Sequence, residues 1–281
     1  MITVSGMNSI DPSLFSGMER AIFMRKDQSP IVYRYESLTQ LRFELNLRIK
    51  ILEAANGLLR SKAAFASFKK SRCNTIFWNL TAYGGFALKR GDLPSTAIRD
   101  IFTNGALYAF ECSTAMVIVL YKAVLDSIGE YRFNQYFADL LLWYWVLDKD
   151  LRYITINSSR ESYPGDILYF NNPDFIPDTP EWRGENVVKF DENLYYGHGI
   201  GITNAEGIIA VLNKIRKPNS TRSAYLLEQA SYPDFKYLFH IAAGRSSDHY
   251  VYESVQQFNR NLITAKIGLS RQIRVFDICN H

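Results

Sequence analysis

The sequence is short of cysteine and has no long hydrophobic run, and each shortage excludes a class of protein. Cysteine occurs three times in 281 residues, at Cys73, Cys112 and Cys279, with no CxxC pair. An odd and sparse set of this kind is neither a disulfide framework nor a paired-cysteine zinc site. The longest apolar stretch is residues 115–120. A bilayer span needs about 20 residues, so we expect no membrane partner.

The chain also lacks a large excess of charge of one sign. Its net charge is +4, and its densest basic cluster, Lys69 and Lys70 with Arg72, is typical of a solvated surface. We therefore expect no nucleic-acid partner. Residues 1–6 contain no basic segment followed by an apolar one, so no signal peptide is evident. We expect the protein to be made and folded in a reducing cytoplasm.

Signatures of several common enzyme classes are missing as well. There is no Walker motif, no HExxH and no GxSxG, and the glycine-rich segment 197–201 lacks the spacing of a dinucleotide-binding loop. The chain does have apolar surface for a core, since 47% of its residues are hydrophobic and 14% are aromatic. This composition predicts a folded globular protein.

Helical periodicity dominates the first half of the chain. Residues 1–35 carry turn signals and are expected to be irregular. Ser37 suits the N-cap of the helix that follows, and Pro94 occupies the first-turn position that proline favours. Gly129 suits the end of the helix that begins at Cys112. The helices expected are 37–60, 95–104, 112–128 and 132–145, with short strands at 76–78 and 85–88.

Strands dominate the second half, and a tight turn joins two of them as a hairpin. The strands expected are 151–156, 167–170, 185–190 and 195–202, and the short helices expected are 206–216 and 234–242. Helices come first, then the Cys112 helix, then an antiparallel sheet. This order predicts an α+β fold with the topology of papain-like proteins. We expect a single catalytic domain over residues 1–243 and a tail or appended helix over 244–281.

Cys112 is the candidate nucleophile. In the first turn of its helix it would lie beside unpaired N–H groups and the positive end of the helix dipole, which favour a thiolate. The same N–H groups are natural donors to an oxyanion. Glu111 opposes activation because an adjacent carboxylate raises the pKa of a thiol, unless it handles protons or orients a substrate. The pattern fits a cysteine-dependent acyl transferase or hydrolase; the alternative is a cysteine that only fills space.

An activated cysteine needs a proton acceptor, and the predicted hairpin carries two candidates. His198 lies on a predicted strand between two glycines, where the backbone can approach another group closely. Glu185 begins a strand whose next residues are apolar, and burial beside Cys112 would raise the pKa of its carboxyl group toward that of a useful base. Either side chain could be the main proton carrier.

Eight short segments of the chain, taken together in their order, point to one known family. They are Phe43-Glu44-Leu45-Asn46-Leu47-Arg48, Phe65-Ala66-Ser67-Phe68, Asn74 with Trp78, Ala97-Ile98-Arg99-Asp100-Ile101, Tyr108-Ala109-Phe110-Glu111-Cys112, Gly165-Asp166-Ile167-Leu168-Tyr169-Phe170, Trp182-Arg183-Gly184-Glu185-Asn186 and His198-Gly199. In sequence and order they resemble the protein-glutamine γ-glutamyltransferase (transglutaminase) of the spore coat of bacilli.

The resemblance implies a core similar to the NlpC/P60 branch of papain-like folds. It implies Cys112 as nucleophile, Glu185 as its principal partner, Glu111 as an assisting carboxylate and His198 near the site. It also implies calcium-independent activity with no metal and no cofactor. The implied reaction joins Gln and Lys side chains of spore-coat proteins by a γ-glutamyl-ε-lysine bond, through a Cys thioester, with release of ammonia. The implied location is the spore coat, after synthesis in the mother cell.

Two further residues and two other functions complete these hypotheses. A thioester must be kept from water, and we expect Trp145 and Trp182 to wall the substrate site. A papain-like amidase or peptidase would use the same thiol with water as the acceptor. A non-catalytic structural coat protein would instead carry an inert, buried Cys112.

Overall fold

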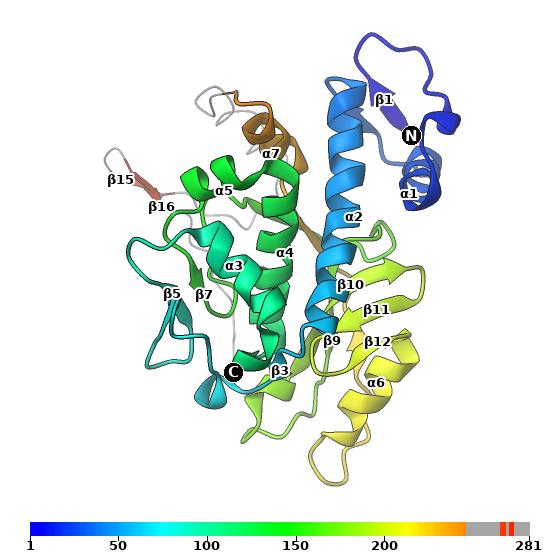
Figure 1. Ribbon diagram of the computed structural model, residues 1–281. Helices are drawn as coiled ribbons and strands as arrows, with labels where there is room; N and C mark the ends of the chain where they lie inside the picture. Colours follow the sequence, from blue (N-terminus) through cyan, green and yellow to red (C-terminus); the bar gives the residue numbers. More distant parts are fainter. Residues whose placement is uncertain (246–264, 268–269, 273–281) are drawn as a thin grey trace.

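The computed structural model describes residues 1–245, 265–267 and 270–272 (Figure 1). Helices pack against an antiparallel sheet, which confirms the expected mixture of helices and strands. The tail or appended helix expected over 244–281 lies largely outside the described residues. Its described part includes β15 (Ala265–Ile267) and β16 (Ser270–Gln272), which pair with each other. No helix in the described ranges is long and apolar enough to cross a membrane.

Two long helices form the centre of the molecule. α2 (Leu38–Arg60) and α4 (Cys112–Ile128) pack along each other (Figure 1). Ser37 caps α2 as predicted, because its side chain accepts a hydrogen bond from the N–H of Gln40. α4 is buried around almost its whole circumference, and such a helix needs other elements on every side.

The cover of α4 comes from three shorter helices and from the sheet. α3 (Pro94–Thr103) begins at its proline as predicted, and α5 (Glu130–Tyr136) follows directly after Gly129. The third helix is α7 (Phe235–Ala242), close to its predicted limits. All three contribute to one hydrophobic cluster with α4.

Within the described residues, the main sheet has seven strands in the order β12-β11-β10-β9-β14-β8, with β13 paired to β9. Every pairing in it is antiparallel. The strands are β8 (Tyr153–Ile156), β9 (Ile167–Asn171), β10 (Gly184–Asp191), β11 (Leu194–Gly197), β12 (Gly201–Thr203), β13 (Tyr225–Leu226) and β14 (Ala230–Pro233). The predicted hairpin is therefore confirmed as β10 and β11, whereas β13 and β14 were not predicted.

The two faces of this sheet are covered by different helices. Val188 of β10 packs into the cluster around α4, whereas Val187 packs with Ile208 and Leu212 of α6 (Ala205–Lys214). Successive residues of a strand point to opposite faces. β10 is therefore enclosed between α4 and α6, and α4 contacts it directly.

Smaller strands lead the chain into α4. β3 (Ala64–Phe65) pairs in parallel with β6 (Ala109–Phe110), which ends immediately before Glu111. A separate sheet consists of β4 (Trp78–Leu80), β5 (Phe86–Leu88) and β7 (Leu141–Leu142). One-turn helices lie at Pro12–Leu14, Phe68–Lys70, Gly105–Leu107 and Pro180–Trp182.

The expectation that residues 1–35 are irregular is wrong. They form β1 (Ile2–Val4), α1 (Gly17–Gln28) and β2 (Tyr33–Tyr35), and β1 and β2 pair in parallel. Long-range contacts hold this region: Lys26 of α1 pairs with Glu44 of α2 in the protein interior. A search for local periodicity does not detect an element whose stability comes from such contacts.

Two other predicted elements are too long. The helix expected over 132–145 ends at Tyr136, and the chain then turns through β7 toward Tyr144, whose φ is 49°. The strand expected over 195–202 is divided into β11 and β12. Gly199, in the turn between them, has a φ of 93°, a left-handed conformation that interrupts the strand and that glycine adopts readily.

Candidate active site

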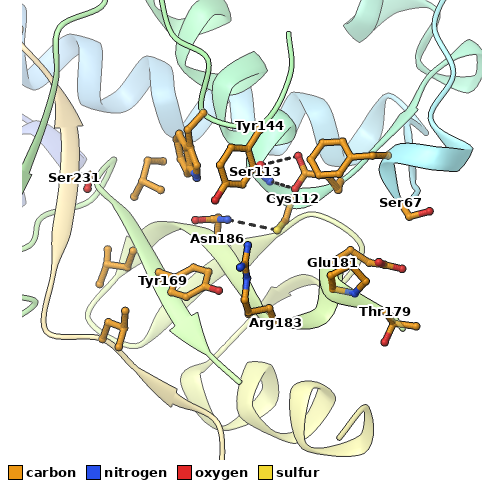
Figure 2. Close-up of a pocket in the computed structure, with 18 of the residues that line it drawn as sticks. Ser67, Cys112, Ser113, Tyr144, Tyr169, Thr179, Glu181, Arg183, Asn186 and Ser231 are labelled. Atoms are coloured by element: carbon orange, nitrogen blue, oxygen red, sulfur yellow. Dashed lines mark hydrogen bonds between the residues drawn. The ribbon is translucent and has the colours of Figure 1, made fainter. Parts of the chain in front are cut away.

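Cys112 is the first residue of α4 and lines a cavity of about 920 Å³ (Figure 2). The cavity lies where the start of α4 meets β9 and β10, and residues 67–70 and 178–181 form part of its wall. The Cys112 side chain is only 4% exposed, yet its sulfur borders this space. The cysteine is thus buried and also reachable by a group that enters the cavity.

Glu111 caps the helix that carries the cysteine. Its carboxylate accepts hydrogen bonds from the N–H groups of Ser113 (2.7 Å) and Thr114 (2.6 Å), and from both of their hydroxyl groups. Of the N–H groups at the helix start that were expected to hold an oxyanion, those of Ser113 and Thr114 are therefore not free to do so. An acidic side chain at the N-cap satisfies them first.

Glu185 is the carboxyl group beside the sulfur. It is fully buried and among the described residues makes no hydrogen bond by distance and angle, although the Cys112 thiol and the backbone of His198 lie close enough to its carboxyl group to lower its pKa. Its carboxyl group lies so close to Gly197 that a side chain there would collide with it, since a Cβ at that position would be 2.8 Å from Oε1. Burial and then the negative charge of Glu111 raise the pKa of Glu185 well above its ordinary value, and the Cys112 thiol opposes this rise. The direction agrees with the sequence-based expectation.

The thiol of Cys112 is also shifted toward its neutral form. Burial, then the charges of Glu185 and Glu111, raise its pKa well above the ordinary value. The backbone and side-chain amides of Asn186 oppose that rise by donating hydrogen bonds. The expectation that the helix start stabilises a resting thiolate is therefore wrong, because burial and the negative charges of Glu185 and Glu111 outweigh that effect.

The ring of His198 is directed to other partners. Its Nε2 lies 3.2 Å from the carbonyl oxygen of Ala64, its Nδ1 lies 3.3 Å from the hydroxyl of Tyr196, and the ring stacks on Phe110 at 4.7 Å. Burial lowers its pKa to about 4, so the imidazole is neutral at physiological pH. His198 lies in the turn between β11 and β12, not on a strand, and it does not line the cavity.

The two tryptophans predicted as walls have different positions. Trp145 lines the cavity and stacks on Tyr153 at 5.2 Å. Trp182 is not among the lining residues, and its ring packs on Phe65 at 4.7 Å. The structure thus places Trp145 at the thiol cavity and Trp182 beside it.

Comparisons with known proteins place the chain in a family. A model of the protein-glutamine gamma-glutamyltransferase family matches residues 1–242. The chain belongs to this family. It is 42% identical over 239 residues to the protein-glutamine gamma-glutamyltransferase of Halalkalibacterium halodurans, covering 84% of each chain. It is 44% identical to that of Bacillus subtilis, covering 76% of this chain and 86% of the relative.

A solved structure shares the architecture of this transglutaminase. It is a transglutaminase from Geobacillus stearothermophilus without its C-terminal extension, 50% identical and with a TM-score of 0.70. The match covers 73% of this chain and 98% of that one.

Several lining residues of this transglutaminase were not singled out as site residues from the sequence. Figure 2 shows Tyr144 and Tyr169 on either side of Asn186, with Arg183 pointing toward the thiol. Two of them, Arg183 and Asn186, belong to the same five-residue segment as Glu185, so the segment that identified the acid also contained them. Tyr144 had no such signal, because it was assigned to a helix that ends earlier.

Charges of both signs line the cavity wall. Lys69 and Lys70 contribute positive charges, and Asp178 and Glu181 contribute negative charges. In the described part of the chain, no group of three or more His, Cys, Asp or Glu side chains is placed to hold a metal ion.

Proposed function

We propose that this transglutaminase forms γ-glutamyl-ε-lysine bonds between proteins through a thioester on Cys112. One observation supports this most directly. The Cys112 sulfur borders the cavity, while Glu185 is fully buried beside it. A nucleophile and a proton acceptor are thus adjacent, as acyl transfer requires.

The first step is exchange of a proton within this pair. The Cys112 thiol passes its proton to the Glu185 carboxylate, so the pair keeps the same total charge. Burial raises the pKa of both groups, and its effect therefore largely cancels in the exchange. The thiolate attacks the γ-carboxamide of a glutamine, the proton held by Glu185 goes to the leaving nitrogen, and ammonia departs.

The second step reverses these roles. A lysine ε-amine attacks the thioester, Glu185 accepts a proton from the amine, and the sulfur leaves as the acyl group forms an isopeptide bond. We assign no proton transfer to His198, because its two ring nitrogens face Tyr196 and Ala64. Asp178 and Glu181 provide negative charge in the cavity wall that suits an incoming lysine cation.

Glu111 has an assisting role in this proposal. It lines the cavity but its oxygens are occupied by the first turn of α4, so it acts through its charge. That charge keeps the pKa of Glu185 high enough for the carboxyl group to donate a proton. Trp145, which lines the cavity, is the better supported wall against water, and Trp182 supports Phe65 beside it.

The wider setting of the proposal follows the family resemblance. We propose that residues 1–243 act as a single catalytic domain with a core like that of NlpC/P60 proteins, since a nucleophile helix packs on an antiparallel sheet. The proposed substrates are spore-coat proteins bearing Gln and Lys, and the proposed activity is independent of calcium and of any cofactor. The similarity to enzymes of bacilli supports this setting.

The test is incorporation of a labelled primary amine into a glutamine-bearing protein, with ammonia measured in parallel. Cys112→Ser should abolish both signals, whereas Cys73→Ser, at the other described free cysteine, should retain them. Ammonia without amine incorporation would instead support the amidase or peptidase. Full cross-linking by Cys112→Ser would refute Cys112 as the nucleophile.

A further inference from the structure

We infer that the side-chain amide of Asn186 is a catalytic hydrogen-bond donor, which first holds the Cys112 sulfur and then the oxyanion formed when that sulfur attacks. The inference rests on the proposed function, because it needs Cys112 to be the nucleophile. Asn186 Nδ2 lies 3.5 Å from Cys112 Sγ, a hydrogen bond marked in Figure 2. Asn186 is 8% exposed and lines the cavity, so its amide is fixed in place but faces the substrate space.

The sheet itself explains why the sulfur is at this position. β10 pairs with β9 along its whole length near the site, but its pairing with β11 begins only at Val187, opposite Gly197. On the β11 side, Asn186 therefore has no strand partner. The Cys112 sulfur accepts a hydrogen bond from the side-chain amide of Asn186, and the backbone amide of that residue also lowers the pKa of the thiol.

Two backbone donors near the sulfur are already occupied. The N–H groups of Ser113 and Thr114 point to the Glu111 carboxylate. Arg183 lines the same cavity, but among the described side chains the hydrogen bond to the sulfur comes from Asn186. The amide of Asn186 is thus in position to interact with charge that moves from the sulfur to an adjacent oxygen.

The reaction moves charge in that way. When the thiolate attacks, the Sγ–C bond forms and the carbonyl electron pair moves to the oxygen. When the intermediate collapses, that pair returns to re-form the carbonyl, the C–N bond breaks, and the nitrogen leaves as ammonia with the proton from Glu185. A neutral amide suits this role, because it stabilises the transient anion without adding charge to a site that already contains two carboxyl groups.

The experiment compares Asn186→Ala and Asn186→Asp with the wild type in two assays. Ammonia release from a glutamine peptide should show a kcat lower by about 10²–10³-fold and a KM changed by less than about threefold. Alkylation of Cys112 by iodoacetamide, measured against pH, should have its midpoint at higher pH in Asn186→Ala, because a donor that favours the thiolate is gone. Asn186→Asp keeps the size of the side chain and tests the donor if the alanine variant does not fold.

Other ionisable groups face the same sulfur, so the pH shift needs controls. They are Glu111 before α4, Glu185 on β10, Tyr169 on β9 and Arg183 before β10. The shift caused by Asn186→Ala should therefore persist in a Glu185→Gln background. Asn74→Ala is the matched control, since Asn74 is also 8% exposed and donates to Asp100, but it does not line the cavity. It should leave both assays unchanged.

A folded Asn186→Ala or Asn186→Asp enzyme with the wild-type alkylation profile and a kcat within about threefold of wild type would overturn the inference. That result is distinguishable from failure of the proposed function. If alkylation of Cys112 still abolishes activity while Asn186 variants remain active, only the role of Asn186 fails. If Cys112→Ser stays active, the proposed nucleophile fails as well.

Discussion

Among the described residues, two of the buried clusters of ionisable groups have opposite compositions of charge. One cluster consists of Lys26, Glu44, Arg48 and Asp166, where α1, α2 and the start of β9 meet. Each carboxylate in it contacts a cation: Arg48 donates to Glu44 at 2.9 Å and to Asp166 at 2.6 Å. This cluster is a compensated network.

The other cluster is formed by Glu111, Cys112 and Glu185, and it contains only groups that become negative. Both Glu44 and Glu185 are buried, yet the pKa of Glu44 is lowered to about 2 and that of Glu185 is raised well above its ordinary value. Burial acts in the same direction on both, so the partners decide the outcome: two cations at Glu44, and another carboxylate at Glu185. Removing one partner from the compensated cluster would leave a buried charge unpaired, whereas the uncompensated cluster is suited to move protons.

The largest expected effect comes from changing the acid of the uncompensated cluster. Glu185→Gln should lower the rates of ammonia release and amine incorporation by about 10²–10⁴-fold, because proton transfer in both steps is lost. The same substitution should move the alkylation midpoint of Cys112 to lower pH, since a neighbouring negative charge is gone. A variant with more than a tenth of wild-type activity would contradict this assignment.

The next effect concerns stability. Arg48→Met leaves Asp166 without the cation it contacts and Glu44 with one fewer, and we expect the free energy of unfolding to fall by about 3–5 kcal/mol. Urea unfolding followed by circular dichroism measures it. Arg99→Met is the control, because the Arg99–Glu130 pair is solvent-exposed and its loss should change the free energy of unfolding very little. Equal losses for the two variants would remove the contrast between buried and exposed pairs.

The acid dependence of stability tests Glu44 alone. Its pKa is lower in the folded protein than in an unfolded chain, so its contribution is present above the unfolded pKa and is lost as the pH falls toward 2. The stability difference between wild type and Glu44→Gln should be about 3 kcal/mol near neutral pH and should shrink between pH 4.5 and 2. A difference that stays constant over this range would show that Glu44 is not held ionised by its partners.

The smallest expected effect combines both roles of Glu111. Glu111→Gln weakens the cap of α4 and should lower the free energy of unfolding by about 1 kcal/mol. It also removes a charge that raises the pKa of Glu185, so the acid limb of the pH–rate profile should move to lower pH. A stability loss with an unmoved acid limb would restrict Glu111 to capping.

Local sequence by itself determined a large part of this protein. The Ser37 cap, the proline at the start of α3, the mostly apolar α4 and the β10–β11 hairpin follow from side chains a few positions apart. Cys112 at the first turn of α4 also follows from local pattern. These features were predictable because capping, turn formation and periodic burial act over short stretches of chain.

Tertiary structure alone decided how the site behaves. The N-terminal helix α1 and the turning away of His198 depend on contacts with distant segments. The raised pKa of Glu185 depends on complete burial beside Glu111. The position of Asn186 beside the sulfur depends on the sheet, because the pairing of β10 with β11 reaches Val187 but not Asn186. Desolvation and charge–charge interactions are set by which groups surround an atom in space, so no spacing along the chain reveals them.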